Sequence, residues 1–174
     1  MAPSPFTTVT GIFHRAVDAR FTDDAIRGSR SAGRYSPPET PTLYLSSSPE
    51  GVEAAMVAHT DTTTPPREQL AFDVQAERIV DLRDAEALAV LGVDLADAMA
   101  LWRPAVEAGE KPSSWAVRRR LGEAGAHGLI DPSRTVPGLW HLTRFRWNEG
   151  GAPRVTRAPG GVTAGPGASP RRTR

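Results

Sequence analysis

The sequence predicts a single α+β domain, in which a mixed or antiparallel β-sheet is flanked by helices. Its 174 residues are enough for one domain with a substantial hydrophobic core, and 39% of them are hydrophobic. Segments that alternate polar and apolar residues, as half-buried strands do, are mixed with segments of helical character. Because they follow no regular strand–helix–strand rhythm, an α+β arrangement is favoured over a doubly wound parallel sheet.

The first half of the chain is predicted to contain two strands and a helix. A first strand is expected over 9–17, followed by a loop or short helix over 18–33. Residues 42–47 alternate polar and apolar residues, which is typical of a half-buried strand. A helix over 49–60 comes next, with Ser48 as its N-cap and a proline in its first turn.

The second half begins after a threonine- and proline-rich breaker at 61–66. Alternating or β-branched runs predict strands, and longer runs between turn residues predict helices. The expected elements are strands at 70–74 and 78–82, a helical region over 84–102 with a break near Gly92, a helix over 112–122, a strand at 128–130, a turn at 131–133 and a strand over 139–147.

The C-terminal segment differs from the rest in composition. Residues 151–174 contain five arginines, five glycines, four prolines and no acidic residue. Because this segment has too little apolar surface to offset the conformational entropy lost on ordering, we expect a disordered tail. Residues 1–8 are expected to be a flexible N-terminus and 9–150 to form the domain. An arm for an anionic partner is the alternative for the tail, but scattered arginines bind nucleic acid weakly at physiological salt, and direct nucleic-acid binding is not expected.

Several classes of protein are disfavoured by composition. The chain has no cysteine, which excludes disulfides and thiolate metal sites, and its four histidines show no tight ligand spacing, so no metal site is expected. No apolar run is long enough for a membrane span, and no signal peptide is evident, so we expect a cytoplasmic protein without membrane contact. The glycine-rich nucleotide-binding fingerprints are absent.

Two further candidate sites have simpler interpretations. Ser133, His141 and Asp131 supply the residue types of a hydrolase triad, but no G-x-S-x-G elbow accompanies them, and the stretch around Ser133 reads equally as a β-turn. The basic triplet 118–120 on a predicted helix is more typical of a solvated face than of a nucleic-acid surface.

A ligand site is indicated by polar residues on loops and strand ends. Arg34 and Tyr35 lie on a loop stiffened by three prolines, and rigid loops often present binding side chains. Together with Arg15, Tyr44 and Ser133 they would line one cleft for an anionic, aromatic ligand such as a dinucleotide. Arginine forks bind phosphates, and a tyrosine ring stacks on a flat base.

The same residues resemble the RES domain family. The resemblance covers about residues 9–147 and is most specific in the middle motif, an Arg-aromatic pair followed by Pro-x-x-Pro-x-Leu-Tyr-x-Ser. The matching pieces, in order, are Phe13–Val17, Gly33–Tyr35, Pro38–Ser46, Ser48–Glu50 and Pro132–Ser133.

The resemblance implies a fold similar to ADP-ribosyltransferase toxins and the activity of a bacterial toxin that degrades NAD⁺. NAD⁺ is then a substrate, no separate cofactor is expected, and the partner is an Xre-type helix-turn-helix antitoxin. By resemblance, Arg15 and Arg34 bind NAD⁺ through its pyrophosphate. Tyr35 and Tyr44 pack on the nicotinamide and its ribose, and Ser133 is the family serine.

One family residue is displaced in this chain. The family glutamate lies on the helix where this sequence has Ala55 and Met56, and Glu53 is the nearest acid. A three-residue offset leaves Glu53 about 60° from the expected direction and about one turn along the helix, so that it can substitute for the family residue. A two-residue offset puts Glu53 on the far side, and the chain then lacks the family glutamate. Glu53 is therefore the candidate catalytic carboxylate for cleaving the nicotinamide–ribose bond by hydrolysis or phosphorolysis. ADP-ribosyl transfer to a protein and a catalytically silent binding module are the alternatives.

Overall fold

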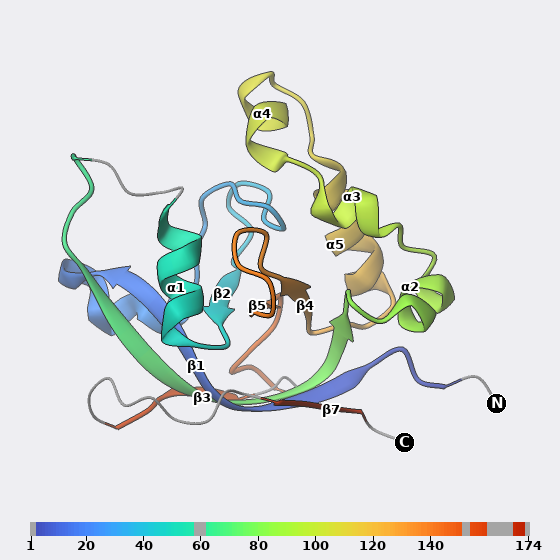
Figure 1. Ribbon diagram of the computed structural model, residues 1–174, viewed down its shortest axis with the longest axis horizontal. Coiled ribbons are helices and arrows are strands. Elements are labelled where there is room, and N and C mark those ends of the chain that lie inside the picture. Colours follow the sequence, from blue (N-terminus) through green and yellow to red (C-terminus); the bar gives the residue numbers. More distant parts are fainter. Residues whose placement is uncertain (1–2, 58–61, 151–153, 160–168, 173–174) are drawn as a thin grey trace.

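The computed structural model describes residues 3–57, 62–150, 154–159 and 169–172 (Figure 1). The strands are β1 (Thr7–Asp18), β2 (Leu43–Ser46), β3 (Arg67–Asp81), β4 (Gly128–Pro132), β5 (Trp140–Arg144), β6 (Arg154–Arg157) and β7 (Ser169–Arg172). The helices are a 3₁₀-helix η1 (Ala19–Arg27), α1 (Pro49–Met56), α2 (Ala85–Leu91), α3 (Leu95–Met99), α4 (Trp102–Glu107) and α5 (Ser113–Glu123).

The strands form one mixed sheet whose central part closes on itself. Its order is β6-β3-β4-β5-β2-β1-β7, and β3 also pairs with β1. Strand β3 is antiparallel to β1 along most of its length and parallel to β4 at its end, while β1 meets β2 through His14 and Ser46. Strands β1, β2, β5, β4 and β3 therefore form a closed ring, which leaves few backbone groups at open edges. The predicted mixed β core flanked by helices is confirmed.

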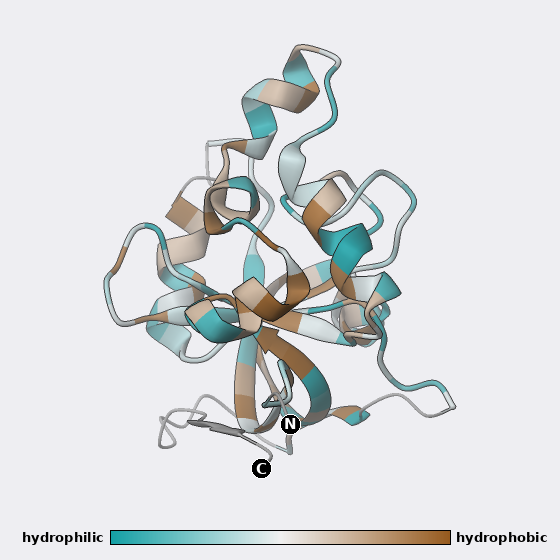
Figure 2. Ribbon diagram, turned by 90° about the vertical axis from the view of Figure 1, so that its right-hand side faces the viewer, coloured by the Kyte–Doolittle hydropathy of each residue, from teal (hydrophilic) through white to brown (hydrophobic). Residues whose placement is uncertain are grey.

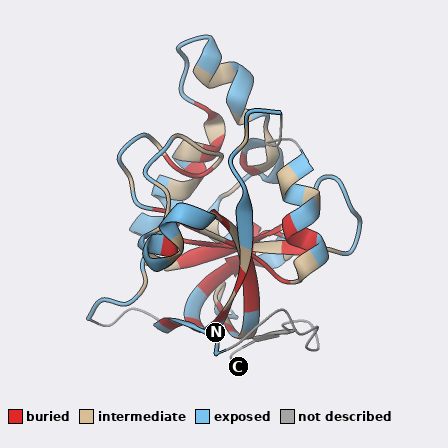
Figure 3. Cartoon of the chain, turned by 90° about the vertical axis from the view of Figure 1, so that its left-hand side faces the viewer, coloured by how far each residue is buried: buried red, intermediate tan, exposed pale blue. Residues whose placement is uncertain are grey.

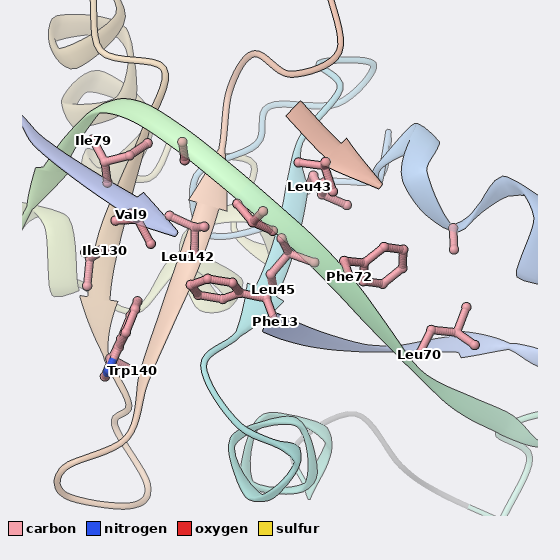
Figure 4. Close-up of a cluster of buried hydrophobic side chains, with 14 of the residues drawn as sticks. Val9, Phe13, Leu43, Leu45, Leu70, Phe72, Ile79, Ile130, Trp140 and Leu142 are labelled. Carbon is pink, nitrogen blue, oxygen red and sulfur yellow. The ribbon is translucent and has the colours of Figure 1, made fainter. Parts of the chain in front are cut away.

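The main hydrophobic core fills this ring (Figure 4). Phe13 from β1 and Trp140 from β5 meet edge to face, with ring centroids 5.5 Å apart. Leucines of β2 and β5 and Phe72 of β3 complete the contacts, each almost fully buried. Apolar residues accordingly concentrate on the central strands, and the buried residues follow the same strands (Figures 2 and 3).

A second core lies between the outer face of the sheet and helices α2, α3 and α5. It includes Tyr35, Val80, Leu121 and Leu129, all at most 1% exposed. In the view of Figure 1, α1 lies on one side of β2, and α3 and α5 lie on the other. The outer face between these two groups of helices carries the candidate site.

The predicted helix start at Ser48 is confirmed. Its hydroxyl accepts a hydrogen bond from the backbone N–H of Gly51 at 3.1 Å, which satisfies one free donor of the first turn. The last residues of the helix predicted over 49–60 lie outside the part of the chain described. The predicted break in the next helical region is also confirmed, because Gly92 ends α2 with a left-handed φ of 61°. None of the described helices is long and apolar enough to cross a lipid bilayer.

Strand β3 replaces two predicted strands, at 70–74 and 78–82. The alternation changes phase at Glu77 and Arg78, which are both exposed, and Arg78 has a φ of 56°. This local irregularity moves Ile79 and Val80 into successive buried positions without ending the strand. The last predicted strand, over 139–147, is shorter in the structure and ends at Arg144.

Two short segments within the predicted C-terminal tail form strands. Strand β6 pairs with β3, and its Val155 is fully buried in the main core; the backbone of β7 pairs with β1. Strand β6 is held by backbone pairing with β3, by the burial of Val155 and by two hydrogen bonds between Asn148 and the backbone of Val155, contacts that overall composition does not reveal. At the other end, β1 begins at Thr7, which is buried, so the flexible N-terminus is shorter than predicted.

Candidate functional site

A row of polar residues crosses four neighbouring strands. His14 of β1 is paired in register with Ser46 of β2, Ser46 with His141 of β5, and His141 with Asp131 of β4. Residues directly opposite one another on paired strands share a face of the sheet, so these four form one polar row. The residues beside them on three of the strands point into the core of the ring: Leu45, Leu142 and Ile130. The polar row therefore lies on the outer face.

The centre of the polar row is a hydroxyl–imidazole pair. The Ser46 hydroxyl and Nδ1 of His141 are 2.9 Å apart. Burial lowers the pKa of His141, and the positive charge of Arg34 lowers it further. Burial also lowers the pKa of His14, although Glu50 acts in the opposite direction. Both imidazoles are therefore neutral at pH 7, and each offers one donor and one acceptor.

Asp131 closes the row on β4 and is a buried acid, 7% exposed. Burial raises the pKa of Asp131 to about 7, against the opposing effects of Arg34, Arg134 and a hydrogen bond from Thr143. Its Oδ1 has no hydrogen-bond partner among the described residues. A buried carboxylate oxygen without a partner is uncommon in folded proteins and is a feature of functional sites.

Arg34 approaches the row from the loop before β2. Its positive charge lowers the pKa of both Asp131 and His141. The Nη1 atom of Arg34 is buried, and no described residue accepts a hydrogen bond from it. A buried guanidinium nitrogen without a partner can donate to an anion or another acceptor on a ligand.

The loop that carries Arg34 is held by helix α5. The prolines stiffen it, as the sequence predicts, but α5 supplies side-chain donors to three successive backbone carbonyls. The donors and acceptors are Ser114 Oγ to Arg34, Trp115 Nε1 to Gly33 at 2.9 Å, and Arg118 Nη1 to Tyr35 at 2.9 Å. Arg118 was expected to face solvent; instead it also donates to Thr42 and Pro41 of the same segment. The backbone of Arg34 is therefore fixed before any ligand binds.

Gly33 has a steric reason to precede Arg34. A Cβ at this position would lie 2.7 Å from the hydroxyl of Ser36 and 2.9 Å from that of Tyr44. Those two hydroxyls hydrogen-bond each other at 2.8 Å, and the Tyr44 hydroxyl also accepts from the backbone N–H of Tyr35 at 3.1 Å. The Gly-Arg-Tyr motif thus places its arginine by folding tightly around the end of Tyr44.

The two tyrosines differ from the expectation of two stacking surfaces. Tyr35 is only 1% exposed, packs in the second core, and donates its hydroxyl proton to the carbonyl of Ala98 at 3.1 Å. The expected packing of Tyr35 on nicotinamide is therefore corrected, because its ring is enclosed by the domain itself. Tyr44 is partly buried. Burial raises the pKa of both phenols, so both stay protonated.

Ser133 lies two residues beyond Asp131, in the turn between β4 and β5. Its backbone N–H donates to the carbonyl of Leu139 at 2.8 Å, and its hydroxyl accepts from the N–H of Val136 at 3.3 Å. These bonds close the hairpin and hold Ser133 near the end of the polar row. The hydroxyl hydrogen-bonded to His141 is that of Ser46, so the triad considered with Ser133 is not the pairing in the structure.

Arg15 and Glu53 lie apart from Arg34. Arg15 follows His14 on β1 and so points to the opposite face, where its Nη1 donates to the carbonyl of Ala25 at 2.6 Å. Burial lowers the pKa of Arg15, and the neighbouring charge of Arg67 lowers it further. Glu53 is exposed on α1. Among the described contacts, none joins either residue to the polar row.

The structure thus gathers Arg34, Tyr35, Tyr44 and Ser133 around the polar row and adds residues that sequence reasoning passed over. Arg134 follows Ser133 and acts electrostatically on Asp131 and Arg34. The four residues of the polar row become neighbours through the register of the paired strands, and the sequence of a single strand does not reveal that register. No group of three or more potential metal ligands occurs within the described ranges.

The ring of strands, the flanking helices and a fixed arginine beside a polar row define an α+β domain with a candidate site for a polar, anionic ligand. The family model of the RES domain matches residues 12–164. The chain therefore belongs to the RES domain family, as the sequence motifs predicted.

Among solved structures, the chain is similar to one chain in the crystal structure of the M. tuberculosis MbcT-MbcA toxin-antitoxin complex. The TM-score is 0.54 at 18% sequence identity, and the match covers 87% of this chain and 85% of that chain. At this identity the likeness supports the fold and no finer detail. No curated protein sequence matches the chain.

Proposed function

We propose that this protein is a toxin-like enzyme that degrades NAD⁺ by cleaving the bond between nicotinamide and ribose. Membership of the RES domain family supports the class of protein, and the similar fold of a chain from a toxin–antitoxin complex agrees with it. The observation that carries the proposal is the Nη1 atom of Arg34, which is buried beside a polar row without a hydrogen-bond partner among the described residues, on a loop whose backbone is held by α5. Water or phosphate is the acceptor.

Arg34 is assigned to the pyrophosphate of NAD⁺. A guanidinium has five donors in a rigid fork and binds phosphate oxygens in pairs. Arg15 is the second proposed NAD⁺-binding arginine, although its side chain lies on the face of β1 opposite the polar row. The charge of Arg67 lowers the pKa of Arg15, so a bound anion would relieve repulsion between the two cations. Tyr44 is proposed to lie beside the bound nucleotide, while Tyr35 positions Arg34 through the core.

The chemistry requires stabilisation of positive charge on the ribose. Loss of nicotinamide passes through a transition state resembling an oxocarbenium ion, and a carboxylate near the ribose stabilises it. Glu53 is the proposed carboxylate on α1, and Ser133 the proposed polar contact on the β4–β5 turn. Removing one electrostatic stabiliser of this kind typically lowers the rate on the order of 10²- to 10³-fold.

A cognate antitoxin is the proposed protein partner. The similar solved chain belongs to a toxin–antitoxin complex, and an Xre-type helix-turn-helix protein is the partner type that the family resemblance implies. Co-purification of this chain with the product of an adjacent gene of that type tests the assignment. Failure of the two proteins to form a complex would remove it.

The direct test of activity is release of nicotinamide from NAD⁺ by the purified protein, compared with Arg34→Ala. Arg30→Ala is the matched control, because Arg30 is exposed on the same loop. We expect cleavage by the parent and by Arg30→Ala, and loss of cleavage in Arg34→Ala. Label from NAD⁺ appearing on lysate proteins would instead identify ADP-ribosyl transfer. NAD⁺ binding without any cleavage would identify a silent binding module.

A further inference from the structure

We propose that Asp131 and Arg34 together bind a ribose hydroxyl of the ligand, with the carboxylate accepting its hydrogen bond and the guanidinium donating to its oxygen. This inference deepens the proposed function and rests on it, because it names the part of NAD⁺ that the polar row recognises. Asp131 thereby becomes a substrate-binding residue, in addition to the arginines, tyrosines, serine and glutamate expected from the family.

The first observation is a pair of complementary polar atoms. Oδ1 of Asp131 is a buried acceptor and Nη1 of Arg34 is a buried donor, and neither has a hydrogen-bond partner among the described residues. The charge of Arg34 acts on the Asp131 carboxyl and lowers its pKa, against the larger effect of burial. Yet the ion pairs of the described residues do not include them. The atoms lie on β4 and on the loop before β2, two elements that are both fixed by the fold.

A hydroxyl is the chemical group that satisfies both atoms. A phosphate oxygen would satisfy Arg34 but would be repelled by the Asp131 carboxylate, and an ammonium group would satisfy Asp131 but would be repelled by Arg34. A hydroxyl donates through its hydrogen and accepts through its oxygen, so one atom serves both residues. An ordered water has the same pattern, and a ligand hydroxyl that replaces it reproduces its hydrogen bonds.

The neighbours of Asp131 extend this pattern along the row. His141 lies directly opposite Asp131 on β5, and its Nδ1 is bonded to Ser46 on β2. Opposite residues on paired strands have Cβ atoms about 4.5–5.5 Å apart, a spacing suited to a ring with adjacent hydroxyls. The guanidinium of Arg34 has further donors, and among the described residues none of them hydrogen-bonds, so we assign them to the phosphate next to that ribose.

The carboxylate form of Asp131 is the one that accepts a hydrogen bond through both oxygens, and burial raises the pKa of this acid to about 7. The charged and titratable groups around it are Arg34 and Tyr35 on the loop, Arg134 after β4, His141 on β5 and Tyr44 on β2. Binding that needs the carboxylate should therefore strengthen as the pH rises through about 7.

The test is calorimetric binding of ADP-ribose to the full chain and to its Asp131→Ala and Asp131→Asn variants at pH 6 and pH 8. ADP-ribose keeps the ribose hydroxyls and lacks the nicotinamide carboxamide, which also both donates and accepts. Asp73→Asn is the matched control, because Asp73 is an exposed strand aspartate. Unfolding curves verify that each variant is folded, and Asp131→Asn keeps the size of the side chain.

We expect Asp131→Ala to bind ADP-ribose at least tenfold more weakly at pH 8 and Asp73→Asn to bind it like the parent. The parent should bind more tightly at pH 8 than at pH 6, and Asp131→Asn should lose that difference. Unchanged ADP-ribose affinity in both Asp131 variants, in a protein that cleaves NAD⁺, overturns this inference alone. The inference is also overturned if the Asp131 substitutions weaken binding of NAD⁺ and leave binding of ADP-ribose unchanged. A parent that neither binds ADP-ribose nor cleaves NAD⁺ overturns the proposed function, and this inference with it.

Discussion

Replacing Asp131 by Asn should make the protein more stable at neutral and alkaline pH. The substitution keeps the size of the side chain and an oxygen that can accept the hydrogen bond from Thr143, but it removes a charge that is buried without a full set of partners. In the parent, burial raises the pKa of Asp131 from 3.8 to about 7. The folded protein therefore holds this proton more tightly than the unfolded chain does.

The magnitude follows from that difference. Each pKa unit corresponds to about 1.4 kcal/mol, so the penalty at high pH is about 4 kcal/mol at most. Below pH 4 both states are protonated, and Asp131 contributes no pH dependence. Between pH 4 and pH 7 the unfolded chain releases the proton while the folded protein retains it, so this residue lowers stability as the pH rises. Above pH 7 the loss is complete and constant.

The assay is urea unfolding at pH 5 and pH 8, followed by the fluorescence of the four tryptophans. The quantity compared is the stability of Asp131→Asn minus that of the parent, which cancels the contributions of the buried histidines. We expect this difference to grow by about 2–3 kcal/mol from pH 5 to pH 8, with an unchanged denaturant slope and no such growth for Asp73→Asn. A difference that is constant with pH would refute the account of a buried, destabilised carboxylate.

Four further outcomes are expected. Arg34→Ala should abolish NAD⁺ binding in calorimetry while lowering stability little, since α5 holds the loop through backbone carbonyls; full binding would remove the assignment. Arg118→Met should lower the free energy of unfolding by about 1–3 kcal/mol, because it strands carbonyl acceptors of that loop; an unchanged midpoint would contradict this. Deleting 151–174 should lower stability by about 1.5–3 kcal/mol through loss of buried Val155, whereas an unchanged melting temperature would mean that β6 contributes nothing. Glu53→Gln should lower the rate of NAD⁺ cleavage at least tenfold and change the free energy of unfolding by less than about 0.5 kcal/mol. Full activity of this variant would mean that another residue supplies the negative charge.

Local patterns in the sequence were sufficient to predict most elements of the fold. The alternation around Tyr44 and the cap at Ser48 predicted β2 and the start of α1, and Gly92 marked the end of α2. The closure of the sheet was not predictable in this way, because β3 pairs with β1 and β4, which are distant in sequence. Strand β6 pairs with an edge of β3 and buries Val155, a local arrangement that composition cannot indicate.

The candidate site was predictable in its residue types and less so in their roles. The structure has Arg34 on a loop, as the Gly-Arg-Tyr motif predicted, and its role at the site stays a proposal, whereas Tyr35 is a core residue. Its burial comes from α3 and α5, whose packing on the loop no local pattern reveals. Asp131 was considered only as part of a turn and a triad, since its place beside His141 depends on strand register.

The most direct test of the central claim is the release of nicotinamide when the purified full chain is incubated with NAD⁺. We expect several turnovers per protein molecule for the parent and no release above background for Arg34→Ala. Absence of nicotinamide release by a folded parent, or equal release by Arg34→Ala, would contradict it.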